Sequence, residues 1–253
     1  FKSQQAAKLA PGVQPGQSKM IAMHRETGKT VWETPLQATN VCYGIPAVHR
    51  AADGTTQIIA ANTGNGMFGL NAADGTMMWS VPAFDKRCVS CPLIVQTRGN
   101  TLVLATTGSG GGGNRLAAVR PGVSGRDAEL VYEINKSVGY VPTSAVLYSP
   151  TDRAPLLFMI SDRGIATCSN ALTGQNVWTR RIGGDFGASP IIIGDKLLLV
   201  SLSGQAHVLR AADKFESLGE FDLGGKSGAS PAVAGGQLVL RIADKLCCLD
   251  IGE

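Results

Sequence analysis

The sequence contains few of the residues from which catalytic sites are built. Its 253 residues include only three histidines, which are scattered along the chain, and they contain no HExxH, GxSxG or EF-hand pattern. The net charge is +4, and Lys and Arg are dispersed rather than gathered in a basic stripe, which argues against nucleic-acid binding. We therefore expect no catalytic residue, no metal-ligand set and no nucleic-acid partner.

Long apolar and helical segments are also missing. Every apolar run is broken by Gly or a charged residue within about ten residues, which argues against a transmembrane segment. The one stretch suited to a helix, Lys2 to Leu9, ends at Pro11-Gly12 and could equally be a frayed terminal segment. We expect a helix content below roughly a tenth.

A turn motif is present in three copies. Each copy has Thr-Gly or Asp-Gly followed four residues later by Trp, and each follows a short apolar run that is typical of a strand. The Gly residues of the first two copies are 47 residues apart, and those of the last two are 99 apart, or about two periods. The motif residues are Gly28, Trp32, Gly75, Trp79, Gly174 and Trp178.

A second marker has the same period. A short apolar run opens at Pro46, Pro92, Ala145, Pro190 and Pro231, at spacings of 46, 53, 45 and 41 residues. Gly, Asp and Asn turns divide each period into about four short strands, which is the pattern of a propeller blade. The sequence therefore predicts an all-β fold, a β-propeller of four-stranded antiparallel blades.

The chemistry of the turn explains the motif. Gly adopts positive φ without a steric clash, as tight hairpins require, and Trp four residues later lies on the next strand. One large aromatic side chain per blade can fill the space between neighbouring sheets. We expect all three tryptophans to be mostly buried in such positions, with no part in ligand binding.

The repeats resemble a known family. The segments Ser161 to Cys168, Leu172 to Trp178, Gly187 to Pro190 and Gly228 to Pro231 are similar to those of PQQ-binding-like β-propeller repeat proteins. This quinoprotein-like group includes outer-membrane assembly lipoproteins and many secreted bacterial proteins. The resemblance implies an N-terminal segment over residues 1–19 and a propeller repeat domain over 20–253.

The number of blades differs from that of the family. The repeats predict about five to six blades, whereas many relatives have about eight. The chain also begins with Phe1 rather than Met. Either the chain is a piece of a larger, eight-bladed ring, or it is a short ring, and we favour the piece.

The cysteines leave several interpretations open. Cys88 and Cys91 form a CxxC pattern, but Pro92 follows where haem attachment requires His. A Cys88–Cys91 disulfide is one alternative, and a buried apolar role is the interpretation we favour. Cys42 lies at the same repeat position as Cys88, four residues before the Pro that opens a strand.

Cys247-Cys248 invites comparison with PQQ alcohol dehydrogenases, in which a vicinal disulfide lies against the cofactor. The pair falls in an expected terminal strand, whose side chains alternate between faces, so we favour a structural role. The calcium ligands and the catalytic Asp of those enzymes have no counterpart that can be assigned in this chain. We expect no cofactor, with PQQ and calcium as the alternative.

The most glycine-rich loop, Gly108 to Arg115, is expected to lie between two strands, Thr101 to Thr106 and Leu116 to Val119. A phosphate-binding loop instead leads into a helix and ends in Gly-Lys-Ser/Thr. We interpret the loop as a flexible hairpin connection, with a ligand-contacting loop as the alternative.

The absence of catalytic residues beside well-formed repeats favours a non-enzymatic binding or scaffolding module, exported from a bacterium to the periplasm or secreted. The alternatives are a PQQ-dependent dehydrogenase-like quinoprotein, or its degenerate relative, and a sugar- or peptide-binding propeller. The partner is expected to be a protein, or a polar small molecule or glycan. Polar and aromatic residues just before the first strand of each blade are candidates for a binding site at the mouth of the central channel. They are Tyr43, Arg87, Tyr140, Asp185 and Lys226.

Overall fold

A computed structural model of the chain describes residues 18–38, 40–123, 127–148 and 154–251. These residues form strands β1 to β21 and no helix, which confirms the all-β fold class. The segment Lys2 to Leu9 lies outside the described residues. The chain divides into two compact units, Phe1–Glu133 and Ile134–Glu253, which are described separately.

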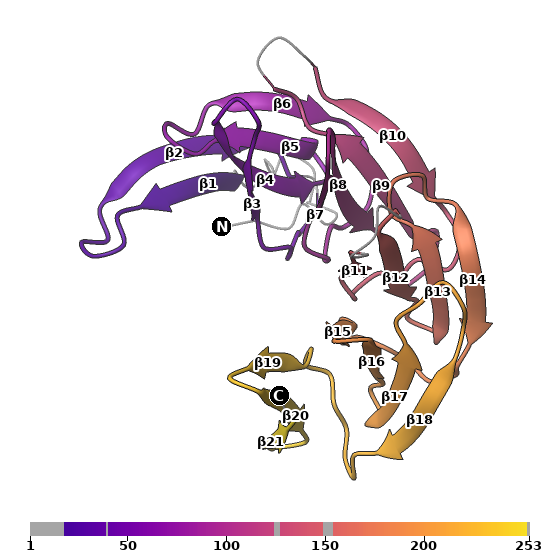
Figure 1. Ribbon diagram of the computed structural model, residues 1–253. Helices are drawn as coiled ribbons and strands as arrows, with labels where there is room; N and C mark the ends of the chain where they lie inside the picture. The colour runs from indigo at the N-terminus through magenta and orange to yellow at the C-terminus, as the bar shows by residue number, and fades with distance from the viewer. Residues whose placement is uncertain (1–17, 39, 124–126, 149–153, 252–253) are drawn as a thin grey trace, which may run out of the picture. The chain divides into compact units, whose positions relative to one another are not determined.

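The first unit contains three sheets in which strands consecutive in sequence are neighbours (Figure 1). The first sheet is formed by β1 (Ser18–Met23) and β2 (Thr30–Leu36). The second consists of β3 (Ala47–Arg50), β4 (Thr56–Asn62), β5 (Gly66–Asn71) and β6 (Met77–Val81). The third consists of β7 (Leu93–Thr97), β8 (Asn100–Thr107), β9 (Arg115–Arg120) and β10 (Glu129–Ile134).

The second unit repeats this arrangement. One sheet consists of β11 (Ala145–Leu147), β12 (Leu156–Ile160), β13 (Ile165–Asn170) and β14 (Asn176–Arg181). The next consists of β15 (Ile191–Ile193), β16 (Lys196–Val200), β17 (Gln205–Arg210) and β18 (Ser217–Asp222). The last consists of β19 (Ala232–Ala234), β20 (Gln237–Ile242) and β21 (Lys245–Asp250). The first strands therefore begin within one residue of the markers predicted from the sequence.

The middle strands of the sheet β15–β18 are apolar on both faces because that sheet packs between two neighbours of the second unit. In β16, Leu197 and Leu199 pack toward the sheet β11–β14, whereas Leu198 and Val200 pack toward the sheet β19–β21. Two-sided burial replaces the alternation of polar and apolar residues that a half-exposed antiparallel strand shows. The fourth strands, such as β14, are mostly exposed.

The turn before each Trp has the expected conformation. Gly28, Gly75 and Gly174 have φ of 67°, 76° and 72°, values that favour glycine. In these three sheets the Trp pairs in register with a small residue on the preceding strand, and a register shift follows immediately. The pairs are Ala22 with Trp32, Gly69 with Trp79, and Cys168 with Trp178.

The tryptophans pack against the following sheet, but the prediction that all three are mostly buried is confirmed only for Trp79 and Trp178. Trp79 and Trp178 are 6% and 7% exposed, and Trp32 is half-buried. Trp32 Nε1 donates a 3.0 Å hydrogen bond to the carbonyl of Ala72, just after the third strand of the next sheet. Trp178 Nε1 donates the equivalent 3.0 Å bond to Ala212.

Candidate functional site

The loops that precede the first strand of each sheet lie beside the turns that join its second and third strands. These lead-in loops are residues 40–46, 82–92, 135–144, 182–190 and 223–231. In three of them a carbonyl accepts a backbone hydrogen bond from the turn: Arg87 from Gly108, Asp185 from Leu202, and Lys226 from Ala243, at 2.8–2.9 Å. These three loops are therefore tied by their backbones to the sheets that follow them.

The five candidate residues all lie in these loops, four of them five residues before the residue that marks the next strand and Tyr43 three residues before it. Tyr43 and Arg87 lie on neighbouring loops of the first unit, where Tyr43 N donates to the carbonyl of Cys88 at 2.9 Å. Tyr140, Asp185 and Lys226 lie on the loops of the second unit. The structure thus places each residue in a lead-in loop. That all five converge on one ligand stays a prediction.

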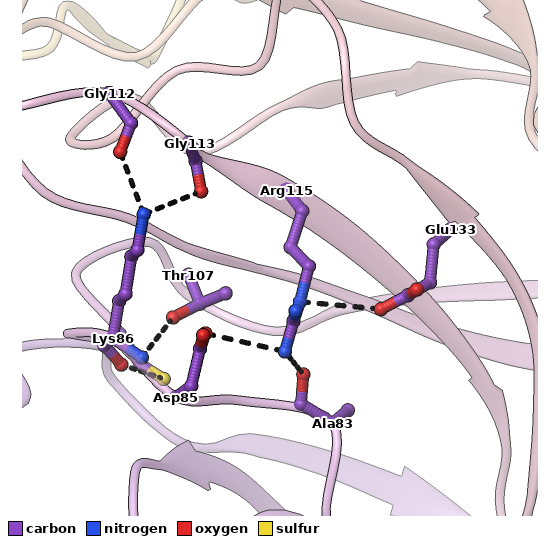
Figure 2. Close-up of polar contacts among 9 residues, drawn as sticks. Ala83, Asp85, Lys86, Thr107, Gly112, Gly113, Arg115 and Glu133 are labelled. Atoms are coloured by element: carbon purple, nitrogen blue, oxygen red, sulfur yellow. Dashed lines mark hydrogen bonds and ion pairs between the residues drawn. The ribbon is translucent and has the colours of Figure 1, made fainter.

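The glycine-rich loop connects β8 and β9, as the hairpin interpretation predicted. Lys86 of the lead-in loop holds it, because Lys86 Nζ donates to the carbonyls of Gly112 and Gly113 at 2.8 and 3.0 Å (Figure 2). Asn114 Oδ1 also accepts from the backbone N–H of Ser109 at 3.0 Å. The loop is a hydrogen-bonded turn fixed by a neighbouring cation.

Arg115, at the start of β9, forms ion pairs with two carboxylates beside this loop (Figure 2). Its guanidinium lies 3.3 Å from a carboxylate oxygen of Asp85 and 3.3 Å from one of Glu133. It also donates to the carbonyl of Ala83. One half-buried arginine therefore connects the lead-in loop to β9 and β10.

The structure pairs the cysteines in a way that the CxxC pattern did not predict. The side chains of Cys42 and Cys88, from two neighbouring loops, lie close enough for each to change the pKa of the other. Cys91 Sγ instead accepts from the backbone N–H of Ile45 at 3.3 Å. Their shared repeat position was the signal in the sequence, because equivalent positions on neighbouring sheets lie close in space.

Cys247 and Cys248 lie in β21 with regular register, opposite Leu240 and Val239. Side chains of consecutive strand residues point to opposite faces, as expected for a structural pair. Among the described residues, no group of three or more His, Cys, Asp or Glu is placed to hold a metal ion.

In the second unit, carboxylates order the lead-in loops. Asp162 accepts hydrogen bonds from the backbone N–H groups of Tyr140 and Val141, at 2.8 and 3.3 Å. Arg163, in the same turn, forms a 3.0 Å ion pair with Asp185 on the next lead-in loop. Both partners of this pair are exposed, so it contributes little to stability but leaves both charges available at the surface.

Large apolar side chains are exposed beside these polar groups. In the first unit, Tyr43 is 62% exposed and Ile45 is 71% exposed, on a loop whose backbone is bonded to Cys88 and Cys91. In the second unit, Val141 and Leu202 are exposed in the same region of the repeat. Each unit therefore presents apolar side chains on loops that are held in place.

Two cavities lie at the other end of the sheets, near turns that the sequence analysis did not select. One, of about 460 Å³, belongs to the first unit, and the other, of about 500 Å³, to the second. The first is lined by polar groups that include the buried His49, whose pKa is lowered by desolvation and raised in part by Asp53. No sequence motif marked these residues, because turns from two different sheets meet there.

Comparison with known proteins then places the chain in a family. The family model described as outer membrane protein assembly factor BamB matches residues 13–214. The chain belongs to the BamB family. Among curated proteins, none matches the sequence.

Solved structures agree on the fold of this BamB-family chain. BamB from Moraxella catarrhalis is 18% identical with a TM-score of 0.60, over 94% of this chain and 68% of that one. Sqt1 from Saccharomyces cerevisiae is 9% identical with a TM-score of 0.65, over 90% and 64%. BBS1N in complex with ARL6DN is 12% identical with a TM-score of 0.59, over 88% and 67%. The chain thus spans about two thirds of each, and the likeness establishes the β-propeller fold alone.

No helix in the described ranges is long and apolar enough to span a membrane.

Proposed function

We propose that this BamB-family chain is a non-enzymatic module that binds a protein of the outer-membrane assembly machinery, outside the cytoplasm. The family description supports the setting and the class of partner. The single observation that supports the binding surface is the exposure of Tyr43 and Ile45 on a loop with a fixed backbone.

The reasoning rests on the cost of exposing apolar side chains. Tyr43 and Ile45 expose apolar surface to water, although their loop is anchored and lies next to the buried apolar cluster of the first unit. Exposed apolar groups that lie together among polar residues are typical of protein interfaces, and aromatic anchors contribute most to binding when buried by a partner. Because the loop is ordered before binding, association costs less conformational entropy.

The charges of the second unit, considered by itself, also suit a protein partner. In the second unit, Arg163 and Asp185 place both signs beside exposed Val141 and Leu202. A mixed polar rim around apolar positions is the ordinary composition of a protein–protein interface. Such rim charges affect the association rate and the specificity more than the affinity.

The proposal includes no PQQ. Its support is the regular strand that holds Cys247 and Cys248, because a vicinal disulfide needs a strained turn that such a strand does not accommodate. Incubation with PQQ and calcium tests this part directly. A bound quinone spectrum, or turnover of alcohols or sugars, would instead establish the dehydrogenase-like alternative.

The main experiment introduces a photo-crosslinking amino acid at Ile45 in cells that contain an outer-membrane assembly machinery. We expect crosslinks to one of its protein components. Tyr43→Ala combined with Ile45→Asp should weaken the binding of purified partner at least tenfold, since two anchors are lost.

The matched control is Val31→Asp, at an exposed apolar position on β2 that lies away from the lead-in loops. This variant should bind normally. Equal binding by the wild type and the Tyr43/Ile45 double variant, with both folded, would show that the partner uses another surface.

A second candidate is a polar small molecule or glycan, favoured by the polar cavity beside His49 and by the candidate residues of the lead-in loops. The volume of this cavity, about 460 Å³, is within the range of ligand sites. A glycan array and a metabolite screen test this candidate. Arg87→Glu and Lys226→Glu then report whether a ligand found in this way uses the lead-in loops, because reversal of charge should reduce the affinity for it.

A further inference from the structure

The thiols of Cys42 and Cys88 meet between two neighbouring lead-in loops. Cys42 Sγ lies 3.5 Å from the carbonyl of Asn40, and Cys88 Sγ lies 3.8 Å from that of Lys86, two residues earlier in each loop. Both cysteines are buried, and both are thiols in the structure. The two loops therefore present their cysteines in the same local conformation.

The backbone brings the two residues within disulfide range. Tyr43 N donates to the carbonyl of Cys88 at 2.9 Å, so the chains run side by side like neighbouring strands, about 5 Å apart. Disulfide-bonded cysteines have Cα atoms separated by about 4.4–6.8 Å. The approach requires Gly44, because a Cβ there would lie 2.5 Å from the carbonyl oxygen of Ser90.

The alternative partner, Cys91, is held elsewhere. Its sulfur accepts the N–H of Ile45 at 3.3 Å. Between the two cysteines of the CxxC pattern, the hydroxyl of Ser90 bonds to that of Thr106 at 2.6 Å and accepts from the Thr106 N–H at 3.1 Å. This segment is therefore fixed on β8, with Cys88 beside Cys42.

We propose that Cys42 and Cys88 are a modification site at which a disulfide joins two neighbouring sheets. A disulfide-containing oxidant, such as oxidised glutathione, supplies the electron acceptor. The Cys42 thiolate attacks one sulfur of the oxidant and releases one thiol. The Cys88 thiolate then attacks Cys42 Sγ and releases the second thiol. The two cysteines lose two protons and two electrons, and the oxidant is reduced to two thiols.

The pKa shifts of the two thiols, in opposite directions, agree with their contact. A hydrogen bond from the Cys88 thiol to the ionised Cys42 lowers the pKa of Cys42, and the same interaction raises the pKa of Cys88. Because both residues are buried in the folded chain, the first exchange takes place before the loops have closed.

The bond would connect the loops that carry Tyr43 and Arg87, and so stiffen the proposed binding surface. Its presence in cells rests on the proposed extracytoplasmic setting, since disulfides persist in oxidising compartments. The pairing itself rests only on the geometry.

The test is to refold the protein in a mixture of oxidised and reduced glutathione, block the remaining thiols, and map the peptides by mass spectrometry. We expect one linked pair that contains Cys42 and Cys88, two hydrogen atoms lighter than the reduced peptides, with Cys91 blocked. The oxidised protein should melt roughly 5–15 °C above the reduced protein, because the crosslink restricts the unfolded chain.

Cys91→Ser is the matched control and should keep both the linked pair and the shift in melting temperature. Cys42→Ser should lose both. If Cys42 of the oxidised wild type carries the blocking group, or if Cys88 is linked to Cys91, the proposal is overturned. This result does not require that any variant folds. Formation in glutathione but not in protein isolated from cells supports the pairing and counts against the extracytoplasmic setting.

Discussion

Trp79 in the first unit and Trp178 in the second occupy the same repeat position but satisfy their indole N–H groups differently. Trp178 donates directly to the carbonyl of Ala212 on the next sheet. Trp79 donates at 2.9 Å to Gln57 in its own sheet, and Gln57 donates at 2.9 Å to the carbonyl of Gly122. The buried side chain of Gln57 thus bridges the N–H of Trp79 and the carbonyl of Gly122.

The packing around the two rings differs in the same way. Trp178 lies among aromatic rings, with centroids 6.0 Å from Phe158 and 5.4 Å from Phe215. Trp79 lies against glycine, since a Cβ at Gly69 would be 2.3 Å from its Nε1 and one at Gly122 would be 2.9 Å from its Cβ. The turn and the bulge decide where the ring lies, whereas the neighbouring residues decide how its volume and its N–H are accommodated.

The largest effect is expected for Trp178→Ala. Loss of the ring should reduce the free energy of unfolding by about 3–5 kcal/mol, because it leaves a cavity among Phe158, Phe215 and their neighbours. Trp32→Ala should cost less, since Trp32 is half-buried. Denaturant titration measures both. The exposed neighbour Val177→Ala serves as the control, and a Trp178→Ala variant as stable as this control would disprove the packing role.

Gly69→Ala should cost about 3 kcal/mol, the upper end of the range for overpacked sites, because the new methyl group meets the Trp79 ring. The residue at the same position in the second unit is Cys168. Cys168→Ala should therefore be tolerated better. Melting curves of the two variants compare the sites directly, and equal losses would mean that the two rings are packed alike.

Gln57→Leu should cost about 2 kcal/mol, because it leaves the Trp79 N–H and the Gly122 carbonyl without their partner in a buried site. A double-mutant cycle with Trp79→Phe isolates the hydrogen bond. We expect the double variant to lose less than the sum of the single losses. Strict additivity would show that the two side chains act independently.

A smaller, pH-dependent effect is expected at His49. Desolvation lowers its pKa in the folded protein below the ordinary 6.5, so the unfolded chain takes up the proton first as pH falls. The contribution of His49 to stability is therefore complete above pH 6.5 and is lost as pH falls from that value toward the lower pKa of the folded state. Chemical denaturation at several pH values measures this loss. His49→Gln should remove this part of the pH dependence, and an unchanged profile would assign it to other groups.

The smallest effect on stability is expected for Lys86→Met, within about 0.5 kcal/mol, because its bonds to Gly112 and Gly113 lie at the surface. Hydrogen exchange in residues 109–113 should nevertheless become faster. Protection that equals that of the wild type would mean that the turn holds its conformation without the lysine.

Much of the fold could be predicted because its signals are local. Gly75 marks a positive-φ turn and Pro190 a strand start, and each depends on a few adjacent residues. The period of the motifs then identified the propeller, and the structure confirms strand starts within one residue of the markers. The first strand is longer than expected, since β1 begins at Ser18 rather than Met20.

The candidate site could be predicted only in part. The positions of Tyr43 and Asp185 in their repeats follow from the period, but the anchoring of Tyr140 by Asp162 joins residues 22 positions apart. The cavity beside His49 likewise needs turns from two sheets. No local sequence pattern predicts contacts between residues that are so far apart in the chain.

The sequence by itself therefore determined the strands, the turns and the repeat, since these arise from backbone conformation and from short apolar runs bounded by turn residues. Only the tertiary structure decided that Cys42 meets Cys88, that Gln57 connects Trp79 to Gly122, and that Lys86 holds the glycine-rich loop. These contacts depend on how neighbouring sheets pack. Equivalent positions come together there because each sheet repeats the geometry of the last, and the side chains at those positions then determine the chemistry.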